Sequence, residues 1–148
     1  NLVDVINRSV DFTKMSSKNE INFNSHNKKP LIQGDIEQLN RVFINLIKNS
    51  EESFVELIKK NDDFKGKIDI EIISNNDYII VKLTDNGTGI SDTKKAMTPY
   101  FTTKKKGTGL GLPIVSKIIN EHSGNFSINN RENINGINIE ISLPKINE

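Results

Sequence analysis

The chain has 148 residues, the size of one ordinary globular domain, with 20 basic and 19 acidic residues and a formal net charge of +1. It contains no cysteine, which excludes disulfides, thiol catalysis and zinc–thiolate sites. The even charge balance argues against a nucleic-acid or membrane-surface module, and no apolar run approaches the roughly 20 residues that span a bilayer. Hydrophobic residues make up only 34% of the chain, but they fall in periodic blocks, so we expect a folded core.

The first half of the sequence predicts a helix end, two short strands and a long helix. Residues 1–12 have helical spacing, residues 20–24 alternate like a half-buried strand, and residues 31–33 read as a second short strand. Asp35 is a good N-cap, and Gln38 completes a capping-box-like pair at the start of the long helix. The apolar stripe of this helix consists of Ile36, Leu39, Val42, Phe43, Leu46, Ile47, Phe54, Leu57 and Ile58.

The second half predicts strands separated by a long irregular segment and one helix. We expect strands at 68–72, 78–83, 125–129 and 136–143, and a helix over residues 112–122. Residues 85–111 are rich in Gly, Thr and Lys and show no period, which is typical of a functional lid or a disordered segment. The order of these elements predicts helices packed on one face of a mixed sheet.

Two asparagines, Asn45 and Asn49, lie four residues apart and therefore on one face of the long helix, at the margin of its apolar stripe. Their amide oxygens can serve as neutral ligands for a hard cation such as Mg²⁺, which keeps several waters and takes phosphate oxygens. The alternative is that both side chains are solvated or tie down a neighbouring loop.

A glycine-containing segment, Asp85 to Ile90, follows directly after a predicted strand. Its glycines permit close approach of a ligand, and an acidic residue at a strand end can accept a hydrogen bond from an exocyclic amine such as that of adenine. Asp-Asn-Gly is also ordinary turn chemistry, so a simple turn is the alternative.

A second glycine cluster, Gly107 to Gly111, leads into the helix that starts near Leu112, and such a loop is suited to binding an anion. It is not a P-loop or a dinucleotide fingerprint, because no strand precedes it and the Gly-Lys-Ser/Thr sequence is missing. The lysines at 104–106 can screen phosphate charge, or they are simply a solvated surface run.

Taken together, the order of these motifs resembles the ATP-binding catalytic domain of bacterial sensor histidine kinases, within the gyrase, Hsp90, histidine kinase and MutL superfamily. Residues 45–49 resemble the N box, residues 85–90 the first glycine box, residues 99–104 the F box, and residues 107–111 the second glycine box. The run from Pro99 to Val115 is most similar to nitrogen-regulation sensor kinases of the NtrY/NtrB type.

The resemblance implies an α+β fold of the Bergerat type. In this two-layer α/β sandwich, three helices cover one face of a mixed, mostly antiparallel sheet, and a mobile ATP lid spans about residues 91–106. Since the chain begins with Asn1, we expect residues 1–18 to be the end of a connector helix from an absent dimerisation and phosphoacceptor domain. Residues 19–148 are then the ATP-binding catalytic domain.

The resemblance also implies roles for individual residues. Asp85 accepts from the adenine amine, Asn49 is the main Mg²⁺ ligand with Asn45 beside it, and Phe101 holds the lid to the domain. The catalytic set is Asn45, Lys48 and Asn49. The nucleotide-binding set is Asn49, Asp85, Gly87, Gly89, Ile90, Thr102, Thr103, Lys104, Gly107, Thr108, Gly109, Leu110 and Gly111.

Two positions depart from the family pattern. Many sensor kinases carry a lysine or arginine where this chain has Glu52, so Lys48 or the lid lysines have to contact phosphate. Hydrolytic relatives carry a glutamate at the first N-box position, where this chain has Asn45. An amide is a poor general base, which favours phosphoryl transfer over hydrolysis.

The expected function is to bind ATP·Mg²⁺ and donate the γ-phosphoryl group to a histidine on the dimerisation domain. His26 only faintly echoes an acceptor box and His122 reads as a helix C-terminal residue, so we expect the acceptor to lie elsewhere. The expected partners are ATP, the dimerisation domain and a response regulator, with no nucleic acid and no direct membrane contact. We expect a cytoplasmic-side domain of a homodimeric parent anchored in the inner membrane. An ATPase clamp using Glu51 or Glu52, and a degenerate interaction module, stay open as alternatives.

Overall fold

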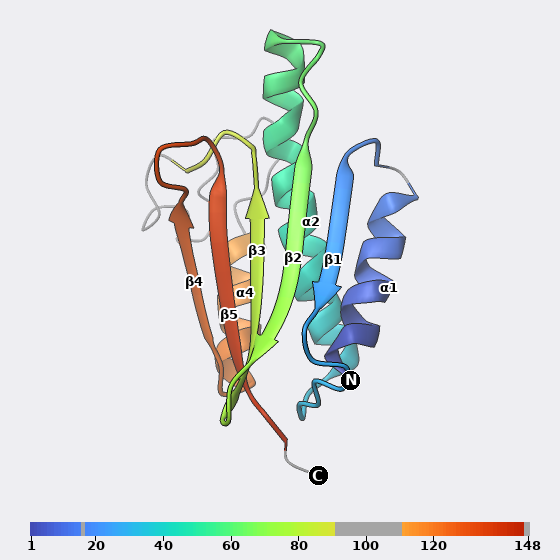
Figure 1. Cartoon of the computed structure of the whole chain (residues 1–148), viewed down its shortest axis with the longest axis vertical. Coiled ribbons are helices and arrows are strands. Elements are labelled where there is room, and N and C mark those ends of the chain that lie inside the picture. The colour runs from blue at the N-terminus through green and yellow to red at the C-terminus, as the bar shows by residue number, and fades with distance from the viewer. Residues whose placement is uncertain (16, 91–110, 147–148) are drawn as a thin grey trace.

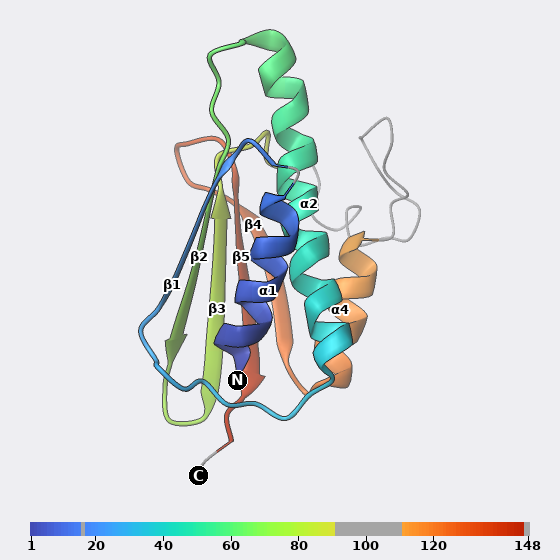
Figure 2. The same cartoon turned by 90° about the vertical axis from the view of Figure 1, so that its right-hand side faces the viewer.

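A five-stranded sheet covered on one face by helices makes up the fold (Figures 1 and 2). The computed structural model describes residues 1–15, 17–90 and 111–146. The described helices are α1 (Leu2–Lys14), α2 (Ile36–Lys60) and α4 (Gly111–Glu121). The strands are β1 (Glu20–Ser25), β2 (Lys67–Ser74), β3 (Tyr78–Asp85), β4 (Asn125–Asn130) and β5 (Ile137–Pro144).

The sheet has the strand order β1-β2-β3-β5-β4, which puts β3 at its centre. β1 pairs with β2 in parallel, and the other neighbouring pairs are antiparallel. Figure 2 shows α1, α2 and α4 together on one side of this sheet. The predicted two-layer α+β architecture, with a mixed and mostly antiparallel sheet, is confirmed.

The core lies between the helices and the inward-facing residues of the strands. Alternate residues of β2, β3 and β5 are buried, as the period of two in the sequence predicts. Helix α1 contributes Leu2, Val5, Ile6 and Val10 to the same core, and it packs on α2. Helix α2 also packs against α4, so it is the central helix of the layer.

Helix α2 begins where the sequence predicts. The side chain of Asp35 accepts a hydrogen bond from the backbone N–H of Gln38 at 3.1 Å, as an N-cap does. The backbone N–H of Asp35 donates to Nε2 of His122 at 3.0 Å. In a capping box this N–H would donate to the side chain of Gln38, so His122 takes the place of that residue. The apolar stripe is buried in its middle, whereas Ile36 and Ile58 at its ends are 56% and 39% exposed.

The predicted strand at residues 31–33 is wrong. This segment is irregular and belongs to the connection that crosses the lower ends of the strands to the start of α2 (Figure 2). Its backbone is held from two sides, because the carbonyl of Pro30 accepts from Leu2 N–H and that of Leu31 accepts from Ile146 N–H. Leu31 and Ile32 are both half-buried, so the short apolar run packs as a connector without the alternation of a strand.

His122 ties the end of α4 to the start of α2. Its Nδ1 contacts the carbonyl oxygen of Ile118 at 2.8 Å while its Nε2 accepts from Asp35 N–H. We predict that His122→Ala lowers the free energy of unfolding by about 1–2 kcal/mol, because it leaves both backbone groups without this partner. Urea unfolding measures this loss.

The other histidine of the chain provides the matched control. His26 is exposed and pairs with Glu71 at 2.8 Å on the surface, so His26→Ala should change stability by no more than about 0.5 kcal/mol. Equal losses for the two variants would show that the His122 tether contributes nothing.

Candidate functional site

Asp85 is the last residue of the central strand β3, and its side chain is only 2% exposed. Oδ2 of this carboxyl group accepts a hydrogen bond from the hydroxyl of Ser50 on α2 at 2.5 Å. Oδ1 accepts from the backbone N–H of Gly87 at 3.0 Å and of Ile137 on β5 at 3.3 Å. All three partners donate, which is the arrangement that an ionised, acceptor-only carboxylate needs.

Glycines allow the chain to close around Asp85. A Cβ atom at Gly87 would overlap with Oγ of Ser53 on α2, so a side chain there would require the Ser53 hydroxyl to move. Gly89 has a φ of +78° and Gly136 a φ of +123°, a region that other residues rarely adopt. A Cβ atom at Gly136 would also overlap with the carbonyl oxygen of Asp85.

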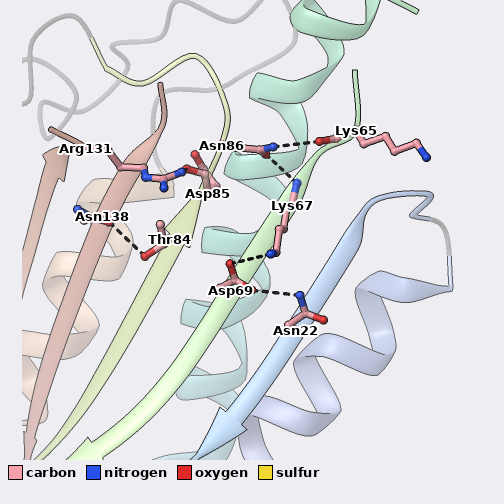
Figure 3. A network of polar contacts seen from close by, with 9 residues as sticks. All are labelled: Asn22, Lys65, Lys67, Asp69, Thr84, Asp85, Asn86, Arg131 and Asn138. Atoms are coloured by element: carbon pink, nitrogen blue, oxygen red, sulfur yellow. Dashed lines mark hydrogen bonds and ion pairs between the residues drawn. The ribbon is translucent and has the colours of Figure 1, made fainter. Parts of the chain in front are cut away.

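Two side chains, those of Arg131 and Asn86, fix the backbone where the chain leaves Asp85 (Figure 3). Nη1 of Arg131 donates to the Asp85 carbonyl oxygen at 3.3 Å. Oδ1 of Asn86 accepts from Lys67 N–H at 2.7 Å, and Nδ2 of Asn86 donates to the Lys65 carbonyl at 3.0 Å. Through Asn86, the start of the glycine segment is therefore bound to the beginning of β2.

The predicted N box lies on the part of α2 that faces α4. Asn45 and Asn49 are both half-buried there. A Cβ atom at Gly111 would lie 3.2 Å from Nδ2 and 3.4 Å from Oδ1 of Asn49, so the start of α4 directly adjoins this amide. The structure thus brings together two predicted site residues that are 62 positions apart in the sequence (111 − 49).

Lys48 lies on a different side of α2. Its Nζ is 5.7 Å from the centroid of the Phe12 ring on α1, a cation–π distance. Successive residues of an α-helix are about 100° apart, so the neighbours Lys48 and Asn49 face different directions. Its predicted contact with phosphate stays a prediction.

Glu51 is held on the α1 side of the domain as well. Its Oε2 accepts a hydrogen bond from Nδ2 of Asn19 at 3.1 Å. This contact directs the carboxylate away from the Asn49–Gly111 side of α2. The structure therefore gives no support to Glu51 as the base of a hydrolytic reaction.

Several predicted residues lie outside the described part of the chain. They belong to the F box, the lid and most of the second glycine box: Phe101, Thr102, Thr103, Lys104, Lys105, Lys106, Gly107, Thr108, Gly109 and Leu110. Within the described part, three residues near Asp85 were not predicted from the sequence, namely Ser50, Asn130 and Arg131. Ser50 carries no motif signal, and the other two reach Asp85 and its loop only through the fold.

Residues 34–147 match the model of the histidine kinase-, DNA gyrase B- and HSP90-like ATPases. The chain belongs to this family. Membership implies ATP binding, which agrees with the order of the sequence motifs and with the position of Asp85 and Asn49.

Several curated relatives are named as sensor histidine kinases. An NtrY-like putative sensor histidine kinase of Rickettsia conorii is 45% identical over 100 residues, covering 66% of this chain and 16% of the relative. Sporulation kinase B of Bacillus subtilis is 38% identical over 116 residues, which cover 77% of this chain and 25% of the relative. The sensor histidine kinase ZraS of Salmonella typhimurium is 34% identical over 152 residues, which cover 99% of this chain and 31% of the relative. The chain thus spans less than a third of the length of these relatives.

Solved structures with the same fold come from the same class of protein. The catalytic domain of histidine kinase ThkA superposes with a TM-score of 0.77 at 31% identity, covering 98% of this chain and 95% of that one. The mycobacterial sensor histidine kinase MprB superposes with a TM-score of 0.81 at 21% identity, covering 99% of this chain and 96% of that one. At this identity the likeness supports the fold alone. The chain is the ATP-binding catalytic domain of a sensor histidine kinase. In the described residues, every helix is too short or too polar to cross a bilayer.

Of the three hydrogen bonds to the Asp85 carboxylate, only the one from the Ser50 hydroxyl comes from a side chain, so a single substitution can remove it. We predict that Ser50→Ala lowers the free energy of unfolding by about 2 kcal/mol, because a buried carboxylate loses one of its donors. Urea unfolding at neutral pH measures the change.

Ser9 of α1 offers a matched control. It is as buried as Ser50, but its hydroxyl contacts the neutral amide oxygen of Asn40 at 3.0 Å and the carbonyl of Val5. Ser9→Ala should therefore cost about 1 kcal/mol. A Ser50→Ala loss no larger than that of Ser9→Ala would show that the Asp85 bond is not a charge-assisted one.

Proposed function

We propose that this domain binds ATP together with Mg²⁺ and donates the γ-phosphoryl group to a histidine of a dimerisation domain outside the sequence. The observation that carries the proposal is the joint placement of Asp85, buried at the end of β3, and Asn49, adjoining the start of α4. These two groups suit the two chemically different ends of ATP.

Asp85 is suited to the adenine end. An ionised carboxylate offers about four lone-pair positions, and three of them are taken by Ser50, Gly87 and Ile137. The remaining position accepts one hydrogen bond, which matches a donor such as the exocyclic amine of adenine. A base with a carbonyl oxygen at that position would be repelled. Gly87 and Gly89 let the loop pack closely against Ser53 and Asn130, and Ile90 follows them at the end of the loop.

Asn45, Asn49 and the start of α4 are suited to the phosphate end. The N-terminus of a helix offers unpaired backbone N–H groups to an anion, and α4 starts at Gly111 beside Asn49. No group of three or more His, Asp or Glu residues that could hold a metal occurs in the described ranges. The donors present, two amide oxygens beside a phosphate position, fit a Mg²⁺ ion coordinated largely by phosphates and water. Such an ion would neutralise charge on the transferring phosphoryl group.

The N-box chemistry favours transfer over hydrolysis. Asn45 is an amide and a poor base, and Glu51 is bonded to Asn19 on the α1 side. In the proposed reaction the bond between the γ-phosphorus and ADP breaks, a phosphorus–nitrogen bond forms to the imidazole, and ADP leaves. The domain supplies position and charge neutralisation. We place Thr102, Thr103, Lys104 and residues 107–110 at the phosphates, with Lys48 as a further candidate cation.

The proposal includes the parent protein. We propose that residues 1–18 connect to a dimerisation and phosphoacceptor domain and that residues 19–148 are the catalytic unit, with a lid at about residues 91–106. The parent would be a homodimer anchored in the inner membrane, with this domain on the cytoplasmic side, and would pass its phosphoryl group to a response regulator in two-component signalling. Supporting this proposal, the relatives named as sensor kinases are three to six times longer than the matching segment.

Asp85 and Asn49 should affect binding in different ways, because they are assigned to opposite ends of the ligand. We predict that Asp85→Asn weakens adenosine, ADP and ATP·Mg²⁺ alike, by at least about tenfold, since the amide presents a donor where the base needs an acceptor. Asn49→Ala should weaken ATP·Mg²⁺ by a similar factor and leave adenosine unchanged. Calorimetry with a non-hydrolysable ATP analogue, with and without Mg²⁺, measures these affinities.

Asn40→Ala is the control on the same helix, because Asn40 faces Ser9 of α1. It should leave all affinities unchanged. The proposal fails if the unmodified domain binds none of the three ligands, or if Asp85→Asn and Asn49→Ala have the same ligand profile.

The isolated domain should not phosphorylate itself. His26 lies near Ile72 at the far end of β2 from Asp85, and both ring nitrogens of His122 are engaged at the far end of α4 from Gly111. We predict that incubation with γ-labelled ATP and Mg²⁺ gives no acid-labile label on this chain. Acid-labile label on His26, removed by His26→Ala, would contradict the assignment of the acceptor to another domain.

A further inference from the structure

Asn130, the last residue of β4, contacts a single residue of the glycine segment with both ends of its side-chain amide. Its Oδ1 accepts from the backbone N–H of Ile90 at 2.7 Å, and its Nδ2 donates to the carbonyl oxygen of Ile90 at 2.6 Å. The two residues are 40 positions apart. The amide thus pairs with Ile90 as an adjacent strand would.

The Asn130 contact also accounts for the residue before Ile90. Gly89 has a φ of +78°, and a Cβ atom there would lie 2.8 Å from Oδ1 of Asn130. A side chain at position 89 would therefore push the amide off Ile90. The glycine is therefore required by the Asn130 contact as well as by its own backbone conformation.

The segment from Asp85 to Ile90 is consequently held at both ends by two consecutive residues. Arg131 donates to the Asp85 carbonyl oxygen, while Asn130 holds Ile90. These residues open the β4–β5 connection, which lies next to the end of β3 (Figure 1). Asn130 is itself exposed, so its contribution to the hydrophobic core is small.

We propose that Asn130 is a positioning residue for adenine recognition. By fixing the backbone of Ile90, it keeps the loop that follows Asp85 in the conformation that receives the base, and so lowers the ordering cost of binding. This inference rests on the proposed function, because it assumes that the base binds at Asp85. It assigns to the β4–β5 connection a role in affinity that no sequence motif of the chain marks.

Asparagine is the residue type that this contact needs. One planar amide presents an acceptor and a donor side by side, matching the N–H and C=O of one residue. An aspartate of the same shape presents two acceptors, so one of its oxygens would face the Ile90 carbonyl. Asn130→Asp therefore changes the chemistry while keeping the volume.

Binding of adenosine and ADP to the intact domain tests the proposal by calorimetry. We expect Asn130→Ala and Asn130→Asp each to lower the affinity for adenosine and for ADP about tenfold. Within one variant the factor should be the same for the two ligands, because the lost bonds act on the base, which both ligands share. Asn129→Ala is the matched control, since Asn129 is the adjacent exposed residue of β4 and its Cα is paired with that of Asn138. It should bind both ligands like the unmodified domain.

Two further measurements separate positioning from general stability. The midpoint of urea unfolding should shift little in Asn130→Asp, because the residue is exposed at a strand end, while amide exchange of Ile90 and its neighbours should accelerate. Adenosine and ADP affinities that stay unchanged in both Asn130 variants, while the unmodified domain binds, would overturn this inference alone. If the unmodified domain binds neither adenosine nor ADP, the inference is overturned, and if it does not bind ATP·Mg²⁺ either, the proposed function is overturned with it.

Discussion

The structure depends on the burial of one carboxylate at the end of the central strand. A buried charge is unfavourable unless hydrogen bonds replace its water, and Asp85 obtains its donors from α2, from the glycine loop and from β5. Those three elements are far apart in sequence. Satisfying Asp85 therefore fixes the helix layer, the loop and the sheet relative to one another, at the position where the base is proposed to bind.

The same helix also carries the position proposed for the phosphate end. Ser50 and Asn49 are neighbours on α2, and the turn of about 100° between them directs the first into the core and the second toward α4. Because Ser50 is bonded to Asp85, the direction of Asn49 and its contact with Gly111 follow from the same bond. The proposed recognition of the base and of the phosphates is thus built on one helix.

Most of the fold follows from local patterns in the sequence, since the period of two in β2, β3 and β5, the N-cap at Asp35 and the stripe of α2 all act over a few residues. The residues that complete the site do not show such a pattern. Ser50 looks like an ordinary helical serine, and Asn130 contacts Ile90 only because β4 and β3 end at the same edge. The direction of the Lys48 side chain depends on Phe12 of α1. The strand predicted at residues 31–33 is wrong because an apolar run this short does not distinguish a strand from an irregular connector.

The low apolar content of the chain explains how its loops are held. Around the site the loops contain few large apolar residues, and asparagine side chains bind their backbones: Asn86 on the β2 side and Asn130 at Ile90. At the far end of the same strands, Asn75 holds the β2–β3 turn in the same way. Such bonds can open one at a time, because no core contact has to break with them. The sheet and α2 can therefore stay folded when one of these bonds is lost, while the loop between Asp85 and Ile90 loses the conformation that Asn130 holds. Affinity can then change through single polar side chains without a comparable change in the stability of the fold.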